Sequence, residues 1–289
     1  MHVIDLFCGA GGFSTGAAQE GAVVVLAVDG WRDALDVHAA NHPGALHWCE
    51  TLGGPPAEFA ERLRGVIAEA VPPGEQVHLH ASPPCQNLSQ VNAGRDEGVG
   101  LALVAWCFEL VDLVRPDSWT VEQVPNAALL RRFAHVPHGV YDMAAHGVPQ
   151  TRRRVIFGHA PRLEEEGRAS FEDALRGAGL DAGGHDEQCN GSIKKRGEGG
   201  EAIYYRRSLR DPSYTVTARF PVFVRGRADM TSLDVRLAAA LQGFPPGYFP
   251  PDTPRVRQMI GNALPPPFAR RLVRSAPGRR RPPAGHVKM

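Results

Sequence analysis

Val3-Ile4-Asp5-Leu6-Phe7-Cys8-Gly9-Ala10-Gly11-Gly12 is the stretch of sequence that decides the fold. Its apolar first half predicts a buried strand, and its glycines predict a tight turn into a helix that ends near Glu20. The turn meets neither the dinucleotide-binding nor the P-loop glycine pattern. Glycines still let the backbone approach a ligand, which in open α/β sheets lies beyond the carboxyl ends of the strands. This turn is therefore the first candidate binding element.

The residues up to about 160 continue the alternation of strands and helices. Further buried strands are predicted at 22–28, 77–81, 119–121 and 155–157, and helices at 32–41, 58–70 and 101–114. Strands that alternate with helices form a parallel sheet with helices packed on both faces. The pattern predicts an α/β fold with a doubly wound, mostly parallel sheet.

The chain changes character after about residue 160. Residues 161–230 are polar, rich in glycine and without regular periodicity, which indicates a small, loop-rich second domain. A predicted helix at 233–241 returns the chain to the first domain, so the expected division is 1–160, 161–230 and 231–289. The tail from Arg270 holds seven arginines or lysines and no acid. It is either a solvated terminus or an auxiliary contact for phosphate.

Composition bounds the class of protein. The net charge of +1 indicates no global preference for nucleic acid, although only Lys194, Lys195 and Lys288 among the 32 basic residues are lysines. Arginine's planar fork suits phosphate and guanine edges. The five cysteines form no CxxC pair, and no apolar stretch is long enough to span a bilayer. We therefore expect a cytoplasmic protein with no disulfide framework, no metal and no membrane contact.

Two side chains stand out beyond the predicted strands. Asp29 ends the second strand about twenty residues after the glycine turn, where a carboxylate commonly binds ribose hydroxyls. Its alternative role is to cap the next helix. Cys85 lies in Ser82-Pro83-Pro84-Cys85-Gln86, a loop stiffened by its prolines. A nucleophile on such a loop is held at little entropic cost, although a buried cysteine beside a turn shows the same local pattern.

Further motifs follow in order along the chain. They are Glu122-Gln123-Val124, Gln150-Thr151-Arg152-Arg153-Arg154, Leu241-Gln242-Gly243-Phe244-Pro245 and Gly261-Asn262-Ala263-Leu264-Pro265-Pro266. Together with the glycine turn, Asp29 and the Cys85 loop, this series resembles the DNA cytosine-5 methyltransferases of bacterial or phage type. Three departures from that family are Gln123 for the usual asparagine, Asn87-Leu88-Ser89 for Pro-Phe-Ser, and 236–240 without the usual glutamate and arginine.

The resemblance implies a Rossmann-like methyltransferase sheet, a small target-recognition domain and S-adenosylmethionine as the cofactor. The cofactor-binding residues that it implies are Phe7, Gly9, Gly11, Gly12, Asp29, Glu50, Thr51, Pro84 and Asn262. The implied catalytic residues are Cys85, Glu122, Arg152 and Arg154. The expected DNA contacts are Gln86, Ser89, Arg95, Arg206, Arg207 and Arg219, with Arg210 and Arg225 as further candidates.

The implied reaction is methylation of cytosine C5 in a short DNA sequence. The Cys85 thiolate would add to C6 and turn the ring into an enamine whose C5 attacks the methyl group. Glu122 would contact N3, where protonation lowers the barrier to that addition. Arg152 and Arg154 would hold the cytosine carbonyl or nearby phosphates, and Arg153 would face another way.

The target base is inaccessible inside a duplex, so the resemblance also implies base flipping. The polar loop at 92–98 would close over the flipped base, with Gln90 or Asn92 filling the space it leaves. Asn262 would support the methionine end of the cofactor and the catalytic loop. The expected partners are double-stranded DNA and a cognate restriction endonuclease, in a restriction-modification role for a monomer. Methylation of tRNA, methylation at cytosine N4 and a non-catalytic DNA-binding role are the alternatives.

Overall fold

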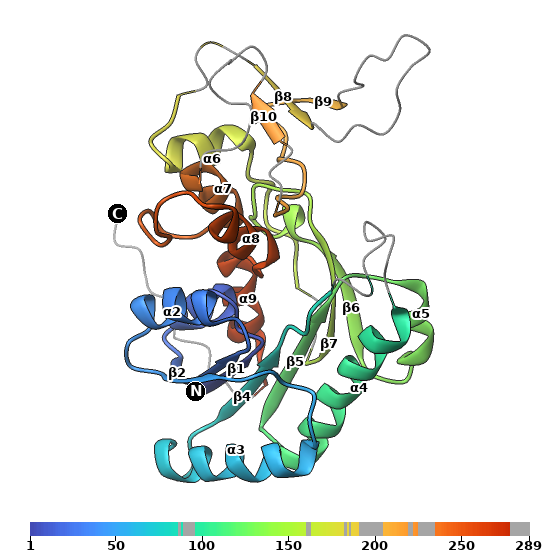
Figure 1. Cartoon of the computed structure of the whole chain (residues 1–289). Helices are drawn as coiled ribbons and strands as arrows, with labels where there is room; N and C mark the ends of the chain where they lie inside the picture. The colour runs from blue at the N-terminus through green and yellow to red at the C-terminus, as the bar shows by residue number, and fades with distance from the viewer. Residues whose placement is uncertain are drawn as a thin grey trace, which may run out of the picture.

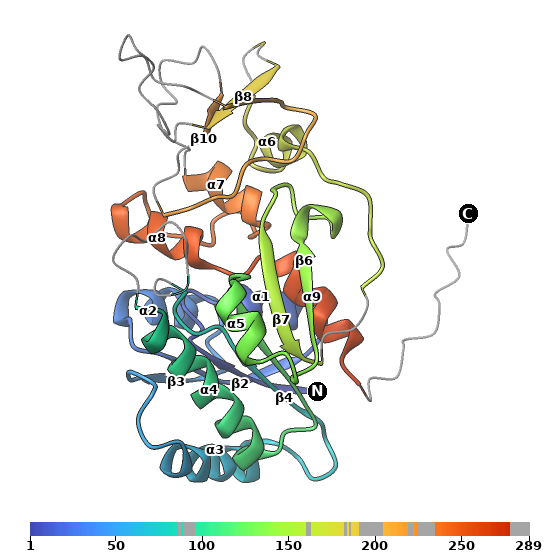
Figure 2. The same cartoon turned by 90° about the vertical axis from the view of Figure 1, so that its right-hand side faces the viewer.

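Figures 1 and 2 show the computed structural model, which describes residues 1–85, 88, 96–159, 163–181, 184, 186–190, 205–218, 222–224 and 235–277. The main sheet contains β1 (His2–Leu6), β2 (Val23–Asp29), β3 (Leu46–Cys49), β4 (Val77–Ala81), β5 (Ser118–Gln123), β6 (His138–Asp142) and β7 (Arg153–Gly158). Its strand order is β3-β2-β1-β4-β5-β7-β6. The strands from β3 to β5 are parallel, and β7 is antiparallel to both its neighbours. The predicted α/β fold with a mostly parallel sheet is confirmed.

Helices cover both faces of this sheet, as Figure 2 shows. The helices of the described residues are α1 (Gly12–Gln19), α2 (Arg32–Asn41), α3 (Pro56–Ala70), α4 (Glu97–Val114), α5 (Ala127–Arg132), α6 (Phe171–Gly177), α7 (Val235–Gln242), α8 (Pro254–Asn262) and α9 (Pro266–Ser275). Of these, α6 and α7 lie beyond the end of the sheet (Figure 1). Ile4 and Leu6 of β1 pack in one apolar layer with α3 and α4, whereas Val3 packs in another with α1 and α9. This alternation is the period of two that a strand requires. No helix in the described part of the chain is long and apolar enough to cross a membrane.

Helix α1 lies directly against α9 because its glycines allow a close approach. A Cβ at Gly12 would lie 2.1 Å from the carbonyl oxygen of Leu264, and one at Gly16 would lie 2.3 Å from that of Pro266. No side chain fits at those distances. The glycine-rich start of the chain is thereby joined to the segment that begins with the closing Gly-Asn motif.

The prediction of a solvated tail from Arg270 is wrong for its first part, because α9 runs to Ser275. Arg271 is only 9% exposed and its guanidinium lies 2.7 Å from the carboxylate of Glu166. Arg274 lies 2.8 Å from the carboxylate of Glu20. Both arginines form ion pairs with acidic residues that lie far away in the sequence. They are therefore not available to phosphate. Residues 278–289 lie outside the described part of the chain.

The region predicted as a small second domain contains an antiparallel sheet of three strands. They are β8 (Glu187–Asn190), β9 (Tyr205–Ser208) and β10 (Val222–Val224), in the order β10-β8-β9. Figure 1 shows this sheet beyond α6 and α7, at the opposite end of the molecule from α3. Helix α6 belongs to the same apolar cluster as α7, through Phe171 and Leu175. The boundaries at residues 160 and 230 remain predictions.

Candidate active site

A cavity of about 380 Å³ lies beyond the carboxyl ends of the parallel strands. Its lining comes from Phe7 and Gly9 after β1, Asp29 at the end of β2, Cys85 after β4 and Glu122 of β5. Arg154 and Asn262 also line it. Residues expected to bind the cofactor and residues expected to act on the base therefore share one cavity.

The glycine turn presents its backbone to this cavity. Phe7 and Gly9 adopt left-handed conformations, with φ of 56° and 51°, which a side-chain-bearing residue such as Phe7 seldom adopts. A Cβ at Gly9 would meet no protein atom within 4 Å, so the peptide there is open to a ligand. Such a local backbone strain is often found at binding sites.

Asp29 joins the glycine turn to α2. Its carboxylate accepts hydrogen bonds from the backbone N–H of Gly9 at 2.8 Å and of Trp31 at 2.7 Å. Burial raises the pKa of Asp29, and both hydrogen bonds oppose that shift. The carboxylate thus lines the cavity and also holds the start of α2, so the two roles considered for it are compatible.

Not all predicted cofactor residues reach the cavity. Gly12, Thr51 and Pro84 line it, but Gly11 faces the opposite side of the turn, where a Cβ would lie 2.7 Å from the hydroxyl of Tyr248. The carboxylate of Glu50 is held by the guanidinium of Arg62 at 2.9 Å and does not line the cavity. For Gly11 and Glu50 the expected direct contact is therefore corrected.

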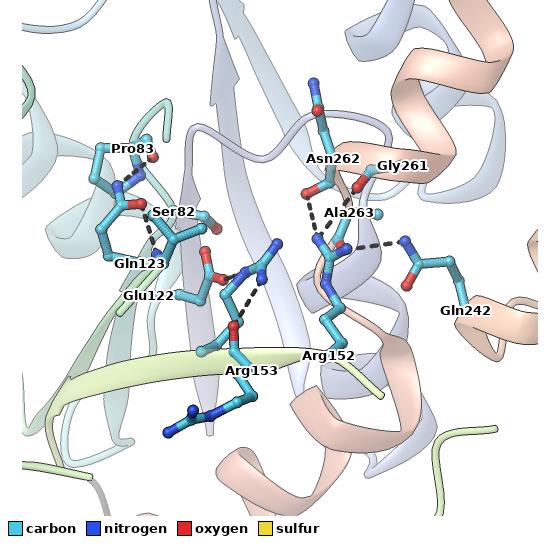
Figure 3. Close-up of polar contacts among 12 residues, drawn as sticks. Ser82, Pro83, Glu122, Gln123, Arg152, Arg153, Gln242, Gly261, Asn262 and Ala263 are labelled. Carbon is cyan, nitrogen blue, oxygen red and sulfur yellow. Dashed lines mark hydrogen bonds and ion pairs between the residues drawn. The ribbon is translucent and has the colours of Figure 1, made fainter. Parts of the chain in front are cut away.

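The loop that carries Cys85 is anchored on both sides. The N–H of Ser82 donates to the carbonyl of Leu6 at 3.1 Å, and the Gln123 side chain donates to the carbonyl of Pro83 at 3.0 Å. Gln123 also accepts from the N–H of Val124 at 2.7 Å, so the residue that replaces the usual asparagine ties β5 to the loop (Figure 3). Cys85 itself is half-buried. Gln86, Ser89, Arg95 and the suggested gap-filling residues Gln90 and Asn92 lie outside the described residues.

Glu122 and Arg154 form a close ion pair on the cavity wall. Arg154 Nε lies 2.6 Å from Glu122 Oε1, and their side chains are 12% and 11% exposed (Figure 3). The antiparallel pairing of β5 with β7 sets Glu122 opposite Ile156, which brings Arg154 to the same edge. Arg153, which lies between Arg152 and Arg154 in the sequence, is exposed and points away from Glu122, as predicted.

Arg152 lies behind the cavity wall and does not line it. It is 2% exposed, and its guanidinium donates to the carbonyls of Val216 and Gly261 at 3.2 Å and of Asn262 at 3.4 Å. Burial, followed by the nearby charge of Arg154, lowers the pKa of Arg152 to about 9. The predicted direct contact of Arg152 with the base is therefore corrected: its donors hold the turn that carries Asn262.

A buried pair of glutamines supports the same turn. Gln150 donates to the carbonyl of Leu241 and to the side-chain oxygen of Gln242, both at 2.9 Å, and accepts from the N–H of Val216 at 2.9 Å. Gln242 donates to the carbonyl of Ile260. Both glutamines lie in motifs that are recognisable in the sequence, but no role for either could be predicted, because their partners are distant in the chain.

The expected DNA contacts in the second domain separate into two kinds. Arg206 of β9 and Arg210 are exposed. Arg207 instead stacks on the ring of Tyr214, 4.0 Å from its centroid, and donates to the hydroxyl of Thr151 at 3.1 Å. Arg207 therefore connects this domain to the arginine motif, and its role as a DNA contact is not supported. Arg219 and Arg225 lie outside the described residues.

Other cavity residues were missed from the sequence. They include Trp31, Leu52, Ser82, Leu103 and Met259. The position of Trp31 two residues after Asp29, and of Ser82 directly after the strand at 77–81, was the available signal. Leu103 and Met259 reach the cavity from α4 and α8, which no local pattern indicates.

Comparison with known proteins agrees with this arrangement. The family model for the C-5 cytosine-specific DNA methylase matches residues 1–132. The type II methyltransferase M.HgiGI of Herpetosiphon aurantiacus is 34% identical over 130 residues, which are 45% of this chain and 94% of that protein. The chain belongs to the C-5 cytosine-specific DNA methylase family. The type II methyltransferase M.AgeI of Thalassovita gelatinovora is 33% identical to this chain over 176 residues, 55% of the chain and 40% of M.AgeI.

A solved structure shares the fold of this chain over nearly its whole length. It is a protein assigned as a DNA modification methyltransferase encoded within an E. coli prophage, with a TM-score of 0.64 at 19% identity. The alignment covers 95% of this chain and 98% of that one. At that identity the likeness concerns the fold alone. The chain spans about half the length, or less, of the first relatives that it matches in sequence.

Proposed function

We propose that the protein transfers a methyl group from S-adenosylmethionine to C5 of a cytosine in double-stranded DNA. The observation that carries the proposal is the single cavity that holds the glycine turn and Asp29 at one end and Cys85, Glu122 and Arg154 at the other. Membership of the C-5 cytosine-specific DNA methylase family supports the same reaction.

The residues at the β2 end fit a nucleoside. Asp29 presents carboxylate oxygens of the kind that bind ribose hydroxyls, and the open peptide at Gly9 accommodates a ligand close to the backbone. The Trp31 side chain adds an aromatic surface to the wall, which suits stacking with a base. S-adenosylmethionine supplies an electrophilic methyl group when bound. Asn262 lines the same cavity, and Arg152 holds it through its carbonyl.

The residues at the β5 end fit a cytosine. Cys85 would attack C6 with its sulfur, forming a covalent bond that makes C5 nucleophilic. Glu122 would hold a proton at N3, and Arg154 orients the Glu122 carboxylate through the 2.6 Å ion pair. After the transfer, loss of the C5 proton would expel the Cys85 sulfur and restore the aromatic ring.

The edge strand that carries the exposed Arg206 belongs to the small sheet, which we assign to recognition of a short DNA sequence. A base must leave the duplex to reach a cavity of this kind, so base flipping is part of the proposal. The relatives named as type II methyltransferases support a role beside a cognate restriction endonuclease. We propose that the enzyme acts as a monomer.

The test is nucleoside mass spectrometry after incubation with S-adenosylmethionine and mixed-sequence duplex DNA. The wild-type protein should form 5-methylcytosine, and Cys85→Ala should form none. Cys49→Ala is the matched control, because Cys49 is also half-buried but does not line the cavity. Formation of N4-methylcytosine, or product that persists in Cys85→Ala, would refute the covalent mechanism. Product on tRNA but not on DNA would refute the assigned substrate.

A further inference from the structure

Ser82 occupies the middle of the cavity edge. Its N–H bonds to the carbonyl of Leu6 on β1 at 3.1 Å, and the residue before it, Ala81, pairs with Val121 on β5. The next residue after Val121 is Glu122, and β4 lies between β1 and β5, so Ser82 lies between the glycine turn and Glu122. Ser82 is half-buried and lines the cavity.

The strand order sets the order in which the lining residues follow one another along the cavity. Asp29 ends β2, Phe7 follows β1, Ser82 follows β4, Glu122 lies on β5 and Arg154 on β7, which is also their order across the sheet. If the nucleoside lies at Asp29 and the cytosine at Glu122, the region at Ser82 faces the part of the methyl donor between them. That part is the sulfonium with its methyl group, and the amino-acid chain, which ends in an ammonium group and a carboxylate, branches from the same sulfur atom.

A buried histidine holds Ser82 in place. His80 is 0% exposed, and its two ring nitrogens lie 2.8 Å from the hydroxyl of Thr120 and 2.9 Å from the hydroxyl of Ser82. Its ring stacks on Phe13, with centroids 3.7 Å apart and planes 3° apart. Phe13 also lines the cavity, so His80 contacts two residues of the wall. Burial keeps the pKa of His80 well below its usual range, so the ring is neutral.

The hydrogen bonds continue from His80 into the sheet. His78 lies 3.0 Å from the hydroxyl of Thr120 and 2.7 Å from that of Ser118, and the pKa of His78 is lowered by burial to about 3. Each neutral imidazole has one donor nitrogen and one acceptor nitrogen, and each hydroxyl can both donate and accept. The whole series from Ser118 to Ser82 can therefore run in either direction. In one direction Ser82 accepts from His80 and can donate into the cavity, and in the other it donates to His80 and can accept.

We propose that the Ser82 hydroxyl is a ligand of the amino-acid end of the methyl donor, and that His80 is the residue that positions it. The inference rests on the proposed function. A hydroxyl that can serve as donor or acceptor suits a group with both a carboxylate and an ammonium. His80 maintains this hydroxyl and the adjacent Phe13 ring in one arrangement, without itself contacting the ligand.

The test compares two ligands of the purified full chain by titration calorimetry. S-adenosylhomocysteine contains the amino-acid end, and 5′-methylthioadenosine is the same thionucleoside without it. Ser82→Ala should weaken S-adenosylhomocysteine binding about tenfold, the loss of one hydrogen bond to a charged group, and leave 5′-methylthioadenosine binding unchanged. Equal weakening of both ligands, or of neither, would overturn the proposal. If the wild-type protein binds neither ligand, the proposed function is wrong, and this inference, which rests on it, is wrong as well.

His80→Phe tests the positioning residue, and His78→Phe is its matched control. Both histidines are fully buried on β4 and each contacts the Thr120 hydroxyl, but only His80 contacts Ser82. Phenylalanine keeps a ring against Phe13 and removes the hydrogen bonds. His80→Phe should weaken S-adenosylhomocysteine several-fold more than His78→Phe, at a similar loss of thermal stability. If the two substitutions weaken S-adenosylhomocysteine binding equally, His80 has only a general packing role and its assignment is overturned. If either histidine variant fails to fold, Ser82→Ala decides the ligand role.

Discussion

Gln150→Leu is expected to destabilise the protein strongly, although it changes no residue of the cavity. Gln150 is 0% exposed and has three partners from two distant segments: the Val216 N–H, the Leu241 carbonyl and the Gln242 side chain, all at 2.9 Å. Leucine has nearly the same volume and satisfies none of them. Each buried polar group left without a partner costs about 1–3 kcal/mol, and the apolar leucine offsets a part of that loss.

We therefore expect the free energy of unfolding to fall by about 3–5 kcal/mol. A typical domain has only about 5–15 kcal/mol in total, so a large share of the stability would be lost. Urea denaturation followed by circular dichroism measures the change, with an unchanged m-value if the folded state is otherwise intact. Gln19→Leu on the exposed face of α1 is the control and should change stability by no more than about 0.5 kcal/mol.

The reasoning would be refuted by a loss below about 1 kcal/mol in Gln150→Leu. Such a result would mean that water or a shifted backbone satisfies the three groups after the substitution. A loss of the expected size should also weaken S-adenosylhomocysteine binding, because Val216 also accepts from Arg152, which holds the Asn262 turn.

Three further predictions concern the catalytic pair, the glycines and pH. Glu122→Gln should lower kcat by about 10²–10⁴-fold and leave S-adenosylhomocysteine affinity within about twofold; a weakened affinity with an unchanged kcat would contradict the assigned role. Gly12→Ala should destabilise the protein by about 3 kcal/mol or more, because its Cβ would lie 2.1 Å from the Leu264 carbonyl oxygen. Gly65→Ala in α3 is the control: a Cβ there meets open space, and the substitution should stabilise the protein by about 0.5–1 kcal/mol. Burial raises the pKa of Asp5 to about 7, so the folded state binds a proton that the unfolded state has already lost, and stability falls as pH rises from about 4 to 7. The free energy of unfolding of the wild-type protein should be lower at pH 8 than at pH 5, and Asp5→Asn should reduce that difference by about 2–3 kcal/mol. An unchanged pH dependence in Asp5→Asn would show that Asp5 is ionised throughout.

Much of the fold and of the site could be predicted because the relevant signals are local. The helix at 32–41 and the strand at 77–81 were predicted with their observed bounds, since their apolar spacing and flanking residues lie within one short window. The glycine turn, Asp29 and Cys85 all lie directly beyond predicted strands. The rule that parallel strands end at one edge was therefore sufficient to expect them together.

The elements that were missed depend on distant partners. Strand β3 is a four-residue edge strand, and the helices α8 and α9, each of which begins at a proline, were not predicted. Helix α9 is amphipathic and packs its apolar face with α1, but its arginines were expected either in a solvated terminus or at phosphate. Arg271 and Arg274 are neutralised by Glu166 and Glu20, more than a hundred residues earlier in the chain.

The sequence by itself determined the class of fold, the order of the motifs and the identity of the reacting groups, because each depends on residue type and short-range spacing. Only the tertiary structure decided which way these residues face. Arg152 and Arg154 are two apart and would share a face on a strand, but β7 begins at Arg153, so Arg152 belongs to the preceding loop and bonds to the Asn262 turn. Arg154 alone reaches Glu122, because an antiparallel neighbour in one particular register sets it there. Register and long-range hydrogen bonds arise from packing of the whole chain, and no local window contains them.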